Sequence, residues 1–157
     1  MAKDRLGVCL SLSKLAPSQY VEYNFNSMCE FRGRYLGANE SGVFVLGEVG
    51  KDGSDSIDAK LKTGLTDFGV SNRKRIRSLL VGYETDGRLK LSVSTDEGVV
   101  RTVELTSKSE ASRQQGGKVS VGRDGIGKYW AFQVENIDGA DFSIDEVSAI
   151  LITRETG

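Results

Sequence analysis

Hydrophobic and polar residues alternate along much of the chain with a period of two. The alternation is strict in the segments 8–14, 57–61 and 89–94. It is typical of a β-strand with one face in the core and one in water, because successive side chains point to opposite faces. Residues 42–47 form a short apolar run between two glycines, which predicts a strand that is buried on both faces.

Turn signals lie where the predicted strands end. An Asp-Gly pair at 86–87 separates 76–84 from 89–94, and Asp-Gly between alternating segments is a strong hairpin signal. Asp-Glu-Gly at 96–98 precedes a further alternating segment in the same way. The sequence therefore predicts an antiparallel meander across this region.

The last third of the chain contains a strand at 128–136, bracketed by Asp-Gly pairs at 124–125 and 138–139. Helical periodicity is scarce. In 145–153, Val147, Ile150 and Leu151 could line a helix face, but the β-branched residues of 150–153 favour a strand. About nine or ten short strands with regular turns predict an antiparallel β-sandwich, jelly-roll-like, with very little helix. We expect the core to include Leu10, Leu12, Leu89, Leu91, Val93, Trp130, Phe132 and Ile144.

The length of 157 residues fits one domain, so we expect residues 1–157 to form a single sandwich with a mobile loop at 107–117. The 19 glycines against a single proline suit many tight reversals. A net charge of −1 gives no global attraction to nucleic acid or to an anionic membrane. No apolar stretch predicts a signal peptide or a membrane span, so we expect synthesis in the cytoplasm, with Cys9 and Cys29 as small buried free thiols.

The residues needed for catalysis are scarce. The chain has no histidine, which excludes Ser-His-Asp, Cys-His and His-containing zinc sites. Two alternatives remain: a carboxylate pair near the lone tryptophan, and a calcium site in the acidic turn at 51–58. We favour turn-forming and surface roles for these acids, and expect no enzymatic activity, cofactor or metal. The acids concerned are Glu135, Asp138, Asp141 and Asp145 for the pair, and Asp52, Asp55 and Asp58 for the calcium site.

The basic run at 73–77 is the main candidate for binding. On a strand, Arg73, Arg75 and Arg77 would share one face. They could be solvated, pair with acids at 84 and 86 across the predicted hairpin, or meet the carboxylates of a protein partner; DNA binding is the least favoured reading. Interfaces favour Arg and Tyr, so Tyr20, Tyr23 and Tyr35 are further interface candidates.

Four stretches, 23–46, 57–69, Lys-Arg-Ile at 74–76 and 121–145, occur in an order that resembles uncharacterised virion structural proteins of tailed bacteriophages and prophages. The segments Thr-Gly-Leu-Thr-Asp-Phe-Gly at 63–69 and Tyr-Trp-Ala-Phe at 129–132 carry much of this resemblance, which spans about residues 20–153. It implies a non-enzymatic building block of a tail, tail tip, collar or head–tail junction, made in the host bacterial cytoplasm and located in the virion. The partners would be copies of itself and other virion proteins, with no small-molecule substrate and no membrane.

The competing interpretation is a carbohydrate-binding module of jelly-roll type. The final strand pair is similar to the closing strands of such modules, and the rings of Tyr129 and Trp130 would then stack on sugar faces. A single tryptophan in a strongly alternating strand is more often part of a core than of a binding platform. We therefore expect Trp130 to be buried.

Overall fold

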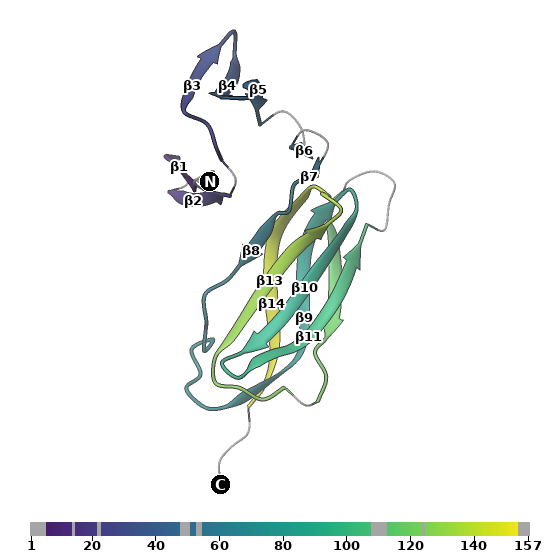
Figure 1. Cartoon of the computed structure of the whole chain (residues 1–157). Coiled ribbons are helices and arrows are strands. Elements are labelled where there is room, and N and C mark those ends of the chain that lie inside the picture. The colour runs from purple at the N-terminus through teal and green to yellow at the C-terminus, as the bar shows by residue number, and fades with distance from the viewer. Residues whose placement is uncertain are drawn as a thin grey trace. The chain divides into compact units, whose positions relative to one another are not determined.

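The computed structural model describes residues 6–13, 15–21, 23–47, 51–52, 55–107, 113–123 and 125–153. Its regular secondary structure in these ranges consists of β-strands with antiparallel pairing, which confirms the all-β fold class (Figure 1). The chain divides into two compact units, Met1–Val49 (unit 1) and Gly50–Gly157 (unit 2). The structure thus differs from the single domain over 1–157 that we expected.

Unit 1 consists of two small sheets. One is the hairpin of β1 and β2, and the other is a three-stranded meander of order β3-β4-β5. Arg32 and Gly33 both have positive φ angles (52° and 76°) at the β3–β4 turn, the backbone that a two-residue hairpin requires. The strands are β1 (Gly7–Ser11), β2 (Ala16–Tyr20), β3 (Ser27–Phe31), β4 (Arg34–Asn39) and β5 (Gly42–Leu46).

Unit 2 is a β-sandwich. Its two main sheets have the orders β11-β10-β13-β8 and β12-β9-β14, and β6 and β7 form a separate short pair. In Figure 1, β9 and β14 lie in the layer behind β13, β10 and β11. The strands are β6 (Lys51–Asp52), β7 (Asp55–Ser56), β8 (Lys60–Lys62), β9 (Lys74–Thr85), β10 (Arg88–Thr95), β11 (Gly98–Thr106), β12 (Gln115–Ser120), β13 (Trp130–Ile137) and β14 (Phe142–Thr153).

The core of unit 2 lies between these two sheets, and alternate side chains of β9, β10 and β13 fill it. Five of the predicted core residues are buried, and Ile144 is half-buried and packs against them. The prediction is wrong for Leu10 and Leu12, which belong to unit 1 and are 51% and 83% exposed. Alternation predicted correctly which side chains share a face in that segment, but no second layer covers this face within the described residues of unit 1. The buried five are Leu89, Leu91, Val93, Trp130 and Phe132.

The predicted meander is only half correct. β10 and β11 pair as expected, but β9 and β10 lie in different sheets, so the turn at 86–87 carries the chain between layers. Neither Asp86 nor Gly87 has a positive φ angle, whereas the favoured two-residue hairpin turn needs both. The turn is instead tied to the β13–β14 corner: Asp141 N donates to Asp86 Oδ1 at 2.8 Å, and Thr85 Oγ1 donates to the Asp141 carbonyl at 2.9 Å.

Two bulges change the alternation in the β9–β14 pair. Arg77 is the extra residue on β9, between the pairs Ile76–Leu151 and Ser78–Ile150, and Asp145 is the extra residue on β14. A bulge inserts one unpaired residue, so the inward-facing positions shift by one beyond it. The strand expected at 145–153 is confirmed as part of β14.

The loop predicted at 107–117 is shorter than expected. Residues 115–117 belong to β12, which pairs with β9. Gly117 faces inward against the ring of Tyr83, with its ideal Cβ position 3.1 Å from Tyr83 Cε1. The glycines that suggested a loop thus lie in a strand, and residues 108–112 fall outside the described ranges.

Candidate interaction surfaces

The strands of unit 1 leave most of their apolar side chains in water. Among the residues that the structure describes in this unit, Gly37 alone is buried. A surface with so many exposed apolar side chains is a candidate interaction surface. The large exposed apolar residues of the unit are Leu6, Val8, Leu10, Leu12, Leu15, Tyr20, Val21, Met28, Phe31, Tyr35, Val43, Phe44 and Val45.

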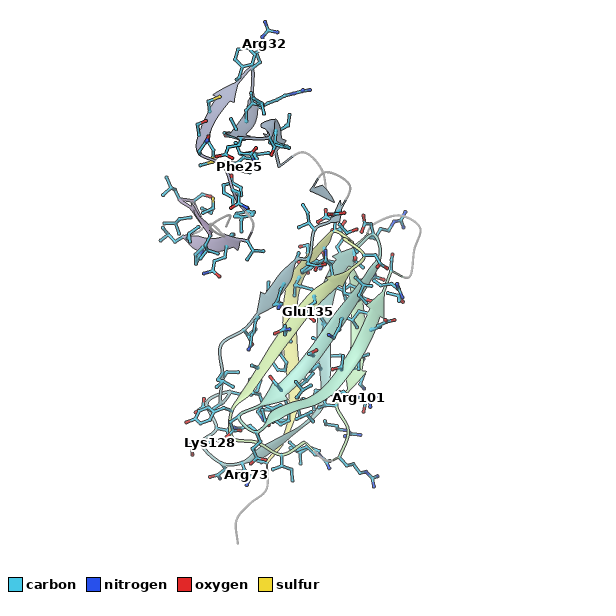
Figure 2. All side chains as sticks on the ribbon, viewed as in Figure 1. Phe25, Arg32, Arg73, Arg101, Lys128 and Glu135 are labelled. Carbon is cyan, nitrogen blue, oxygen red and sulfur yellow. The ribbon has the colours of Figure 1, made fainter. Side chains whose placement is uncertain are left out.

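A row of aromatic rings connects the two sheets of unit 1. The ring centroids of Tyr20 and Tyr23 are 5.6 Å apart, those of Tyr23 and Phe25 are 5.0 Å apart, and those of Phe25 and Phe44 are 5.8 Å apart. Figure 2 shows Phe25 between the β1–β2 hairpin and the β3–β5 sheet. A Cβ on Gly37 would lie 2.7 Å from the Phe25 ring, so this glycine permits the contact.

The predicted interface tyrosines therefore occupy two settings. Tyr23 is half-buried in the aromatic row, while Tyr20 and Tyr35 are exposed. Cys9 on β1 and Cys29 on β3 are free thiols, as expected, but both are exposed rather than buried. The strand at 42–46 is also exposed instead of buried on both faces, because no described part of unit 1 covers the β3–β5 sheet as a second layer.

The three candidate arginines lie close in sequence but differ in their contacts. Arg73 precedes β9 and forms a 2.9 Å ion pair with Glu97, at one end of unit 2 (Figure 2). Arg75 is half-buried, and its Nε atom is buried without a hydrogen-bond partner. Arg77 is exposed at the bulge. The structure thus places Arg75 and Arg77 on the outer side of β9. It pairs Arg73 with Glu97, a partner that the sequence did not predict.

One of the alternatives, the pairing of these arginines with acids across a β9–β10 hairpin, is wrong. Glu84 and Asp86 lie at the far end of β9, and the two strands belong to different sheets. The residues between the arginines point inward, as alternation predicts: Ile76 is fully buried, and buried Lys74 donates from Nζ to the Lys128 carbonyl at 2.6 Å.

Several charged residues of the four-stranded sheet form ion pairs. Glu135 forms ion pairs with Lys60 at 3.4 Å and with Lys90 at 3.1 Å (Figure 2). Arg88 forms a further ion pair with Asp138 at 2.8 Å. The hydrogen bond from Lys90 is the main cause that lowers the pKa of Glu135. A carboxylate held ionised in this way suits an ion-pair network and does not suit a general acid.

The remaining acids of the proposed carboxylate pair occupy turns and the bulge. Asp138 pairs with Arg88, and Asp141 Oδ1 accepts from the backbone N–H of Phe142 at 2.9 Å. Asp145 is exposed at the β14 bulge. The arrangement offers turn formers and ion pairs, which matches the surface roles that we favoured.

The calcium interpretation finds no ligand cluster. No group of three metal-ligating Asp, Glu, Cys or His residues occurs within the described ranges. The backbone of Asp52 pairs with that of Asp55 in the β6–β7 register. Asp58 is exposed beyond that pair.

The two aromatic residues of the carbohydrate interpretation differ in exposure. Trp130 is fully buried in the sandwich core, so its ring is not available to stack on a sugar. Tyr129 is 38% exposed, with Lys128 Nζ 5.2 Å from its ring centroid. A platform of two adjacent rings is therefore not formed.

Comparison with protein-family models, curated proteins and solved structures found no match. The part of the chain that the structure describes contains no helix long and apolar enough to cross a membrane.

Proposed function

We propose that this chain is a non-enzymatic structural subunit that works through protein–protein contacts in a symmetric assembly. The observation that carries this proposal is unit 1, whose strands expose apolar side chains without a covering layer. The resemblance of residues 20–153 to virion proteins makes a tailed bacteriophage particle the assembly that we propose, at its tail, tail tip, collar or head–tail junction. The chain would be made in the host bacterial cytoplasm and act in the virion.

The energetics of unit 1 support assembly. Domains of this size are marginally stable because they bury a small fraction of their surface, and an isolated two-stranded hairpin such as β1–β2 is marginal at best. Burying one exposed Val or Leu side chain contributes about 1.5–3 kcal/mol. Covering a few of the exposed side chains, such as Leu10, Met28 and Val43, would therefore stabilise the unit substantially.

The charge of unit 1 bears on its partner. The segment contains five Lys and Arg residues and five Asp and Glu residues, so its net charge is zero. A neutral apolar surface is suited to protein and is not attracted to DNA or to an anionic membrane. We propose copies of the same chain and other virion proteins as the partners, with no small-molecule substrate.

The test compares substitutions of matched chemistry and exposure in the two units. Val43 in unit 1 and Val99 near the start of β11 in unit 2 are 70% and 69% exposed. We would replace Leu10 and Val43 together by serine, with Val99→Ser as the control, and measure incorporation of each full-length variant into particles. Loss of two buried apolar side chains, about 3 kcal/mol or more, predicts at least a hundredfold weaker incorporation of the double variant.

The control and the stability of unit 2 decide the outcome. Val99→Ser should be incorporated like the unchanged chain, and the fluorescence of Trp130 should show that unit 2 remains folded in both variants. Normal incorporation of the Leu10/Val43 variant would refute the proposal. The sugar-binding alternative gains no support here, because Trp130 is buried.

A further inference from the structure

The outer face of the β12-β9-β14 sheet, called here the β9 face, differs from the outer face of the other sheet. Three large apolar side chains are exposed on it: Leu80 (44%), Ile150 (42%) and Ile152 (36%). The four-stranded sheet instead carries the Lys60–Glu135–Lys90 ion pairs. Exposed apolar residues at alternate outward positions of two paired strands form a surface that can pack against another sheet.

The strand register places opposite charges at the two ends of the β9 face. Arg75 pairs with Ile152, and Arg77 lies at the neighbouring bulge, so this end is basic. Glu146 pairs with Gly82 at the other end. Asp145 lies over the same glycine, with its Cβ 3.4 Å from the ideal Cβ position of Gly82. The two charged ends are separated by about 20 Å of strand.

Between these ends lie the apolar side chains of the face. Leu80 pairs with Ser148, and Ile150 pairs with Ser78, so Leu80 and Ile150 are diagonal neighbours near the middle of the face. Lys118 of the edge strand β12 is exposed and pairs with Leu80 from the other side. The face thus has apolar side chains and one edge-strand lysine in its middle, a basic end and an acidic end. Its two charged ends are complementary to each other when one copy is reversed relative to the other.

From this arrangement we infer that the β9 face binds the β9 face of a second copy of the chain. The two sheets pack face to face around a two-fold axis, with the strands of the two copies running in opposite directions. Leu80 and Ile150 of one copy then meet the same residues of the other. Arg75 and Arg77 of each copy meet Asp145 and Glu146 of its partner. Such a contact is isologous, as in most homodimers.

The size of the face sets the strength of the contact. A sheet of three strands with a longest strand of 12 residues presents about 500 Å² per copy, from the usual rise and strand spacing. Stable interfaces bury about 800 Å² per partner. The pairing is therefore weak in isolation and becomes effective when contacts through unit 1 hold neighbouring copies together. The inference thus rests on the proposed assembly role and names one of its interfaces.

A charge exchange tests the inference on the full-length chain. Variant one carries Arg75→Glu and Arg77→Glu, variant two carries Asp145→Arg and Glu146→Arg, and the control carries Lys62→Glu and Arg101→Glu. The control has the same charge change as variant one, at exposed positions on β8 and β11 of the other sheet. Sedimentation equilibrium of each protein, and of an equimolar mixture of variants one and two, measures the association constants. Trp130 fluorescence checks that unit 2 is folded in each.

Each variant alone should associate at least tenfold more weakly than the unchanged chain, because like charges then face each other at both ends. The mixture should regain the association, since an acidic face meets a basic one, and the control should match the unchanged chain. Equal association of the unchanged chain and both variants would overturn the inference, as would a mixture that fails to associate. If the inference is overturned in this way, the proposed function still holds provided that the Leu10/Val43 variant loses incorporation. The proposed function itself fails if the Leu10/Val43 variant is incorporated normally.

Discussion

Replacing Leu91 by alanine should destabilise unit 2 strongly, whereas the same change at Leu12 should not. Both residues lie in strictly alternating segments, but Leu91 is 0% exposed between the two sheets and Leu12 is 83% exposed in unit 1. Leu→Ala substitutions in a packed core cost about 2.7–5 kcal/mol, because the transfer free energy is lost and a cavity remains. Exposed substitutions change the free energy of unfolding by about 0.5 kcal/mol or less.

Urea unfolding followed by tryptophan fluorescence measures this difference. Trp130 is the single tryptophan of the chain and is fully buried in the same core as Leu91, so its emission reports on unit 2. With a denaturant slope of roughly 1.5 kcal/mol/M, a loss of about 3 kcal/mol lowers the urea midpoint by about 2 M. An unchanged midpoint for Leu91→Ala, or equal shifts for the two variants, would refute the assignment of the core to unit 2 alone.

Three further predictions concern single residues of unit 2, each checked by the urea midpoint. The pKa of Glu135 is lowered, chiefly by the hydrogen bond from Lys90. Ionised Glu135 therefore contributes to the free energy of unfolding above the ordinary pKa of a glutamate, and this contribution is lost as the pH falls through the lowered pKa. In Glu135→Gln, the urea midpoint should decline less steeply below about pH 5. Burial raises the pKa of Tyr83, so the contribution of its neutral form to the free energy of unfolding is present below about pH 10 and lost at higher pH. In Tyr83→Phe, the urea midpoint should fall less steeply above about pH 10. In Gly87→Val, the added Cβ would lie 2.8 Å from Ala140 Cβ, and overpacking should cost about 1–3 kcal/mol.

The pattern of the sequence predicted the strands better than their environment. Period two placed Trp130 and Leu91 on inward faces correctly, because both occur on strands that a second sheet covers. The same pattern at 8–12 predicted a buried face that the structure leaves exposed. Alternation specifies which side chains share a face, whereas burial depends on another layer that is distant in sequence. The division into two units therefore could not be predicted from the two-residue alternation of hydrophobic and polar positions.

The candidate surfaces show the same limit. Tyr20 and Tyr35 were identified from residue type and are exposed, but Arg73 pairs with Glu97, 24 positions away, through a sheet order that the sequence did not reveal. The bulges at Arg77 and Asp145 shift the outward positions of β9 and β14. Ile150 and Ile152 were predicted to lie in a strand, yet their exposure follows only from that shifted register. A signal was present in the run Ile-Leu-Ile at 150–152, which supplies apolar residues to both faces of its strand.

The reactivity of the two cysteines tests the assembly role of unit 1 most directly. Cys9 and Cys29 are exposed free thiols on β1 and β3, within the surface that we propose to be covered in the particle. Labelling with a small thiol reagent, followed by mass spectrometry, compares the isolated chain with intact particles. We predict that both thiols react rapidly in the isolated chain and at least tenfold more slowly in particles. Equal labelling rates in the two states would contradict the proposal that unit 1 is an assembly surface.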